Sequence, residues 1–187
     1  MSFFKSSFGS GKSFVVVPLL LIFLYPILVF FDIYLTYIGT PDLKLESNFV
    51  INVFSLGWFE IITFSIISVI IIILLTIKAN KVFKHLLDLN EKVISLHYLL
   101  NFVIICIFFS HFNYSIFVII NNFLTVIYLK YDNSYWLKDI SNQYVLCYNK
   151  DIAGFYFTAY LISIFVSIIV TFYRIKKAIF YSKKYQI

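Results

Sequence analysis

Ionisable side chains interrupt the long apolar runs of this sequence at several points. Asp32 and Thr36 are four residues apart, so a helix would place them on one face. Glu60 lies in a second apolar run and His111 in a third. Carboxylates bind protons and hard cations, whereas a histidine acts as a general base or as a transition-metal ligand. These residue types make a binding site inside the apolar segments the first candidate for chemistry.

Further polar residues extend this candidate site. A helix places His111 and Asn122 on one face of the third run, with Asn121 beside them. Carboxylates inside a membrane are expensive and are functional candidates by default. We therefore expect one polar cluster in the outer half of the membrane, formed by Asp32, Thr36, Glu46, Asn48, Glu60, His111, Asn121 and Asn122. The simpler alternative is that these groups only hydrogen-bond neighbouring helices, at about 0.6 kcal/mol each.

Two familiar motifs are incomplete in this sequence. The N-terminal tail contains Gly9-Ser10-Gly11-Lys12-Ser13, the end of a phosphate-binding loop, but Ser6 replaces the first glycine of that pattern and no strand precedes it. His97 and His111 are 14 residues apart, a spacing similar to that of paired haem ligands on one helix. Each haem would need a second histidine from a facing helix, and one further histidine, His85, exists. Haem is therefore left open only as a group shared across an oligomer.

The composition identifies the environment of the chain. Of its 187 residues, 61% are hydrophobic and 13% are charged. A soluble domain is about 45–50% apolar and about 25% charged. A soluble globule of this length could not bury so much apolar surface, and two cysteines are too few for a disulfide-stapled domain. The sequence is that of an integral membrane protein.

Four apolar segments are long enough to span a bilayer. They cover residues 14–38, 54–77, 93–129 and 152–172, each near or above the roughly 20 residues that a spanning helix needs. The segments are continuously apolar, and in lipid a helix satisfies its own backbone. The long third segment has no Pro or Gly near its middle, so we expect one tilted helix. The predicted fold is an all-α, four-helix transmembrane bundle forming a single domain over residues 1–187.

The distribution of Lys and Arg predicts the orientation. Eleven of the 15 basic residues lie in the N-terminal tail, the connection after the second span and the C-terminal tail. With four spans these three regions share one side, which the positive-inside bias makes cytoplasmic. We therefore expect both termini in the cytoplasm, in a bacterial plasma (inner) membrane, and the net charge of +6 reflects this orientation. The connection at residues 78–92 is expected to form an amphipathic turn of helix at the headgroups.

Two features predict contacts. Gly154, Ala159, Ser163 and Ser167 form a stripe of small residues on the fourth span, which lets another helix of this chain or of a partner approach closely. The loop at residues 130–151 is rich in Tyr and contains Trp136, which is typical of an aromatic belt at the interface or of a docking surface. We expect a lipid bilayer and membrane-protein partners contacting the spans and this loop, and no nucleic acid.

The stretch around Asp32 resembles a known family. Asp32 and Thr36, followed by Glu46 and Asn48, look like the D-x-x-x-T … E-x-N-P pattern of a family of small uncharacterised prokaryotic multi-pass membrane proteins. The match is confined to residues 31–49, and Phe49 stands where the family has proline. The resemblance draws attention to these residues without naming a reaction.

Three functions follow from these patterns. The first is a non-catalytic subunit or accessory component of a larger membrane assembly, since no catalytic motif is complete and the soluble portions are small. The alternative is an intramembrane site at Asp32, Glu60 and His111 that binds a cation, a proton or a lipid headgroup. The third is an intramembrane hydrolase or transferase with His111 as general base, for which a nucleophile is missing. The sequence names no cofactor.

Overall fold

Each apolar segment of the chain forms one long helix. The structure, a computed structural model, describes residues 16–43, 55–88, 96–130, 139 and 152–184. Within these ranges the helices are α2 (Leu19–Gly39), α4 (Trp58–Asp88), α5 (Leu96–Lys130) and α7 (Ile152–Lys184). All four are long and apolar enough to cross a membrane. The prediction of an all-α, four-helix transmembrane bundle is confirmed.

The helices do not begin and end exactly where the predicted apolar spans do. α2 begins at Leu19 rather than at residue 14, because Pro18 precedes it in an extended conformation (φ −57°, ψ 140°) and has no N–H to donate. α4 and α7 continue past the apolar runs to Asp88 and Lys184. No Pro or Gly interrupts either extension, so the backbone ladder carries on beyond the hydrocarbon. The amphipathic turn expected at residues 78–92 is therefore, as far as Asp88, a continuation of α4. α5 is a single unbroken helix, as predicted for the third span.

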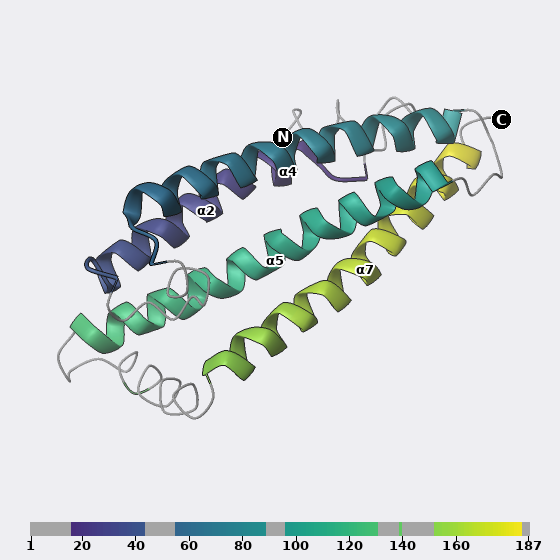
Figure 1. The fold of residues 1–187 in the computed structure, drawn as a ribbon. Helices are drawn as coiled ribbons and strands as arrows, with labels where there is room; N and C mark the ends of the chain where they lie inside the picture. The colour runs from purple at the N-terminus through teal and green to yellow at the C-terminus, as the bar shows by residue number, and fades with distance from the viewer. Residues whose placement is uncertain (1–15, 44–54, 89–95, 131–138, 140–151, 185–187) are drawn as a thin grey trace, which may run out of the picture.

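α5 lies in the middle of the bundle (Figure 1). It packs most extensively against the antiparallel α7 on one side and against α2 on the other, and it also contacts α4. Its buried residues Ile105 and Phe108 lie at the centre of the core, where the ring of Tyr25 meets Phe108 edge to face at 5.7 Å. The central position of α5 lets its side chains reach the other three helices.

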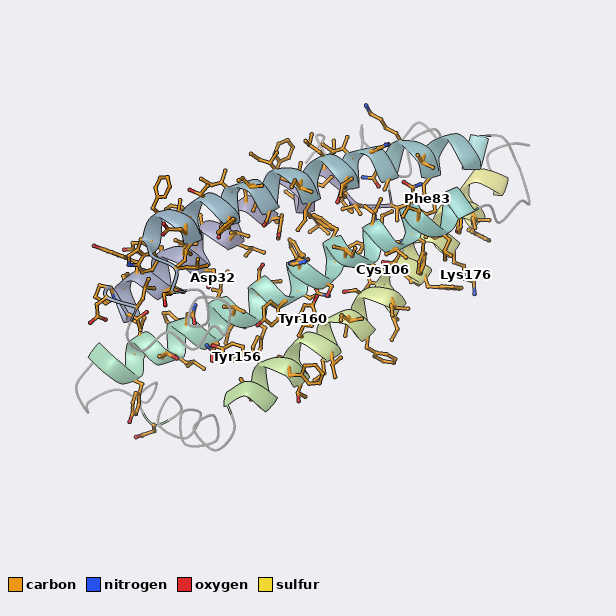
Figure 2. The ribbon with its side chains drawn as sticks, in the orientation of Figure 1. Asp32, Phe83, Cys106, Tyr156, Tyr160 and Lys176 are labelled. Atoms are coloured by element: carbon orange, nitrogen blue, oxygen red, sulfur yellow. The ribbon has the colours of Figure 1, made fainter. Side chains whose placement is uncertain are left out.

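The two ends of the bundle differ in charge. α2 and α5 begin, and α4 and α7 end, at what we call the basic end, where Lys78, Lys81 and Lys176 are exposed. Figure 2 shows Lys176 and Phe83 toward this end and Asp32 and Tyr156 toward the opposite one. We call the opposite end the far end.

Aromatic residues mark the far end. The indole Nε1 of Trp58 donates a hydrogen bond to the carbonyl oxygen of Pro41 at 2.8 Å, and its ring meets Tyr37 edge to face at 5.4 Å. A Trp with an apolar ring and one polar tip is typical of the boundary between hydrocarbon and water. These contacts fix the start of α4 against the end of α2.

Most of the apolar surface of the helices faces outward. α4 is the most apolar of the four spans and the least buried, and large side chains such as Phe59, Ile70 and Leu74 stand exposed along it. Phe165 and Phe172 are exposed in the same way on α7. In water such a surface would be strongly unfavourable, whereas acyl chains are as apolar as these side chains. The outer surface of the bundle therefore fits a lipid environment.

A side-chain clamp holds the residues that lead into α2. Val16 and Val17 are non-helical and almost fully buried, so their backbone groups need partners inside the bundle. Asn80 of α4 supplies two: its Oδ1 accepts from the N–H of Val17 and its Nδ2 donates to the carbonyl oxygen of Val17, both at 3.0 Å. Nε of Arg174 on α7 donates to the carbonyl oxygen of Val16 at 3.0 Å. Three helices thus meet at the basic end through one short segment.

The clamp predicts a stability effect. Asn80→Ala leaves the N–H and carbonyl of Val17 without their partner, which we expect to lower the free energy of unfolding by about 2 kcal/mol. The matched control is Lys81→Ala, which removes an exposed side chain from the next position. Thermal unfolding in detergent micelles measures both. Equal stability of the two variants would contradict the clamp.

Candidate functional site

One amide joins α2 to α5 near the far end. Nδ2 of Asn122 donates to Oδ1 of Asp32 at 2.8 Å and to Oγ1 of Thr36 at 3.0 Å. The three side chains are each partly buried. The structure therefore brings the carboxylate of the first span and an amide of the third span into direct contact.

The four-residue spacing of Asp32 and Thr36 explains why one amide can meet both. The hydroxyl of Thr36 donates to the carbonyl oxygen of Asp32, one turn earlier, at 2.9 Å. Its single proton is therefore used within α2, and the oxygen is left to accept from Asn122. Thr40 repeats the pattern with a bond to the carbonyl oxygen of Thr36 at 3.1 Å. The D-x-x-x-T spacing thus presents two acceptors side by side to α5.

A second amide carries the contact on to α7. Nδ2 of Asn121 donates to the phenolic oxygen of Tyr156 at 2.8 Å and to Oδ1 of Asn122 at 3.1 Å. Asp32 and Tyr156 lie on opposite sides of α5 in Figure 2. We call these five residues the Asp32 cluster: Asp32, Thr36, Asn121, Asn122 and Tyr156. The cluster links three of the four helices through hydrogen-bonded side chains.

Tyr156 is the member of the cluster that sequence reasoning missed. It lies seven residues before Ser163, so it shares a helix face with the small-residue stripe. This position could have predicted its role, because a tyrosine on an inward face needs a hydrogen-bond partner for its hydroxyl.

Glu60 lies apart from the cluster. Its side chain is exposed in the first turn of α4, where Oε2 accepts from the backbone N–H of Gly57 at 3.0 Å. The first N–H groups of a helix have no partner within it and carry a partial positive charge, so a glutamate three residues in is favoured there. The structure assigns Glu60 to the cap of its own helix.

His111 is also outside the cluster. It shares a face of α5 with Asn122 but lies 11 residues earlier, about 16 Å nearer the basic end. Its side chain is half-buried. The other two predicted members, Glu46 and Asn48, lie outside the described residues.

The donor set of the cluster limits its chemistry. Across the ranges that the structure describes, no three His, Cys, Asp or Glu side chains come close enough together to hold a metal ion. The cluster itself offers one carboxylate together with amide, hydroxyl and phenol groups. Oxygen ligands of this kind suit a proton or a hard cation rather than a transition metal.

The small-residue stripe lies inside the bundle. Ser163 and Ser167 are buried, and Gly154 and Ala159 are half-buried, on the helix that packs mainly against α5. Ser163 donates to the carbonyl oxygen of Ala159 at 2.9 Å, and Ser167 donates to that of Ser163. The close approach that the stripe predicted is therefore made within this chain. The predicted docking loop, residues 130–151, lies outside the described residues apart from its first residue and Asp139.

The fold and the cluster together define an all-α integral membrane protein of four spans with a carboxylate held between helices. No protein-family model, curated protein or solved structure matches the chain. The geometry of the Asp32 cluster is therefore what bears on function.

The Asp32–Asn122 contact predicts a measurable coupling energy. In a double-mutant cycle of Asp32→Ala and Asn122→Ala, we expect a coupling of about 1 kcal/mol, because both changes break the same bond. The control cycle pairs Asn122→Ala with Glu60→Ala and should show no coupling. Unfolding of the variants in mixed micelles supplies the four free energies of each cycle. Coupling to Glu60 instead of Asp32 would contradict the observed arrangement.

Proposed function

We propose that this chain is a multi-pass membrane protein whose Asp32 cluster binds a proton or a small hard cation inside the bilayer. The observation that carries the proposal is the contact of Asn122 with both Asp32 and Thr36. Four of the eight residues predicted for the polar site meet in this cluster. This convergence favours the intramembrane site over the accessory role that the sequence alone put first.

The depth of Asp32 supports a binding function. It lies seven residues before the end of α2 at Gly39, about 10 Å below that end. Carboxylates at such depths are rare and generally mark ion or proton pathways. The amide of Asn122 is neutral, so it orients the carboxylate without cancelling its charge.

The charge distribution supports an orientation for this site. The basic end carries Lys78, Lys81 and Lys176 next to apolar spans, which favours a cytoplasmic position for that end and for both termini. The far end, and the Asp32 cluster with it, would then lie toward the outside. We place the protein in a bacterial plasma membrane, in line with its resemblance to a prokaryotic family.

A carboxyl-to-amide pair of variants tests the proposal. Asp32→Asn removes the charge and keeps the shape and an acceptor oxygen, so the bundle should fold while binding is lost. Glu60→Gln makes the same chemical change at a surface cap and should leave binding intact. The measurement is proton uptake after a pH jump in lipid nanodiscs, with calorimetric titration of Na⁺, Mg²⁺ and Ca²⁺ alongside. Wild-type uptake and binding in Asp32→Asn would refute the site.

An accessory role in a larger membrane assembly is the second candidate. It is favoured by the broad apolar surface of α4, the least buried span, which a partner could cover as well as lipid does. The test is purification from native membranes in gentle detergent, with crosslinking beforehand. A stoichiometric partner crosslinked to α4 supports this role, and a chain recovered alone excludes it.

A hydrolase or transferase is not proposed, since His111 lies too far along α5 to act as base at the cluster.

A further inference from the structure

The outward side of α4, which lies along one edge of the bundle (Figure 1), carries an apolar stripe that ends at a lysine. Four exposed residues at spacings of four, three and four line this side, and we call them the α4 stripe: Ile67, Ile71, Leu74 and Lys78. Leu74 is the most exposed of its apolar members, at 61%. Thr76 and Phe83, which are almost fully buried, lie on the opposite side of the helix. The α4 stripe therefore faces away from the other helices.

The length of α4 places Lys78 at a membrane surface. Trp58, with its contacts to Pro41 and Tyr37, marks the boundary between hydrocarbon and water at the far end. Lys78 comes 20 residues later, about 30 Å along the helix axis. The hydrocarbon core of a bilayer is also about 30 Å thick. The ammonium group of Lys78 therefore lies at the depth of the lipid headgroups, while its methylene groups continue the α4 stripe.

A second lysine doubles the positive charge at this depth. Lys81 is exposed three residues after Lys78, so the two side chains are neighbours on one side of the helix. The acidic residues within the four described helices are Asp32, Glu60 and Asp88. Asp32 and Glu60 lie toward the far end, and Asp88 lies about 10 Å beyond Lys81 along α4. The two lysines thus form a local positive charge next to an apolar surface.

We propose that this side of α4 binds an anionic phospholipid, with Lys78 and Lys81 at the headgroup phosphate and the acyl chains along Ile67, Ile71 and Leu74. Charge complementarity selects the headgroup. In phosphatidylcholine the phosphate is already paired with the cation of its own choline, whereas phosphatidylglycerol keeps a net negative charge that lysines at the membrane surface attract. The site is independent of the function proposed for the Asp32 cluster.

The basic end of α7 offers a weaker match to the same lipid. Lys176 is exposed and follows the exposed apolar residues Ile169 and Phe172 on one side of this helix. The next lysine, Lys177, is half-buried, and its Nζ lies 5.9 Å from the centre of the Tyr173 ring. α7 therefore presents one exposed lysine at this depth where α4 presents two. Lys176 is the matched control for the lysines of α4.

Photocrosslinking to lipid in nanodiscs tests the site. The nanodiscs contain equal amounts of phosphatidylglycerol and phosphatidylcholine, one of which carries a diazirine on its acyl chains, and peptide mass spectrometry locates the labelled residues. We expect phosphatidylglycerol to label α4 around Leu74 several-fold more than phosphatidylcholine does. In the double variant Lys78→Gln, Lys81→Gln the two lipids should label α4 equally. Lys176→Gln removes one charge from α7 and should leave the preference at α4 unchanged.

Three outcomes would overturn the lipid site. The first is equal labelling of α4 by the two lipids in the wild-type protein, a comparison that needs no variant. The second is a preference for phosphatidylglycerol that survives in the double variant, since the two lysines would then not be its cause. The third is labelling of α4 by neither lipid together with a crosslink from α4 to another protein chain, because a protein would then cover the α4 stripe.

Discussion

Hydrocarbon offers no hydrogen bonds, so each polar group within the spans must find its partner inside the bundle. This constraint accounts for the two arrangements that hold α2. At the far end the amide of Asn122 meets Asp32 and Thr36, and at the basic end the amide of Asn80 meets the backbone of Val17. Both amides act on atoms that lipid could not have satisfied. Side-chain amides from two different helices thus contribute to holding α2, Asn122 of α5 toward the far end and Asn80 of α4 at the basic end.

The central position of α5 follows from the same constraint. Its adjacent residues Asn121 and Asn122 face different neighbours, one toward Tyr156 on α7 and the other toward Asp32 on α2. Two consecutive amides can therefore connect helices that lie on opposite sides of α5. This connection fixes the depth of Asp32, because a shift of either helix along its axis would separate carboxylate and amide. A carboxylate at a fixed depth, oriented by a neutral donor, is the arrangement that the proposed binding function requires.

The sequence predicted the spans well and the polar contacts less well. Apolar length revealed all four helices, but it could not predict that α4 continues to Asp88, since a helix without Pro or Gly can extend beyond the hydrocarbon. Asp32, Thr36 and Asn122 were predictable from their helix faces and depths. Glu60 was misleading because a residue near a helix start can cap that helix. The contact of Asn80 could not be predicted from the sequence. Its partner is the backbone of a residue 63 positions away, and every residue type has the same backbone carbonyl.

The central claim is that the Asp32 carboxyl is bonded to Asn122 within the bilayer and binds a proton or a small hard cation. Solid-state NMR of the protein in lipid, with ¹³C-labelled aspartate and ¹⁵N-labelled asparagine, tests it most directly, and Asp32→Asn identifies the carboxyl signal. We predict a cross peak between the Asp32 carboxyl carbon and the side-chain nitrogen of Asn122, and a carboxyl shift that moves when the pH is changed or when Na⁺, Mg²⁺ or Ca²⁺ is added. A carboxyl with no contact to Asn122, or one whose shift responds neither to pH nor to these cations, would contradict the account.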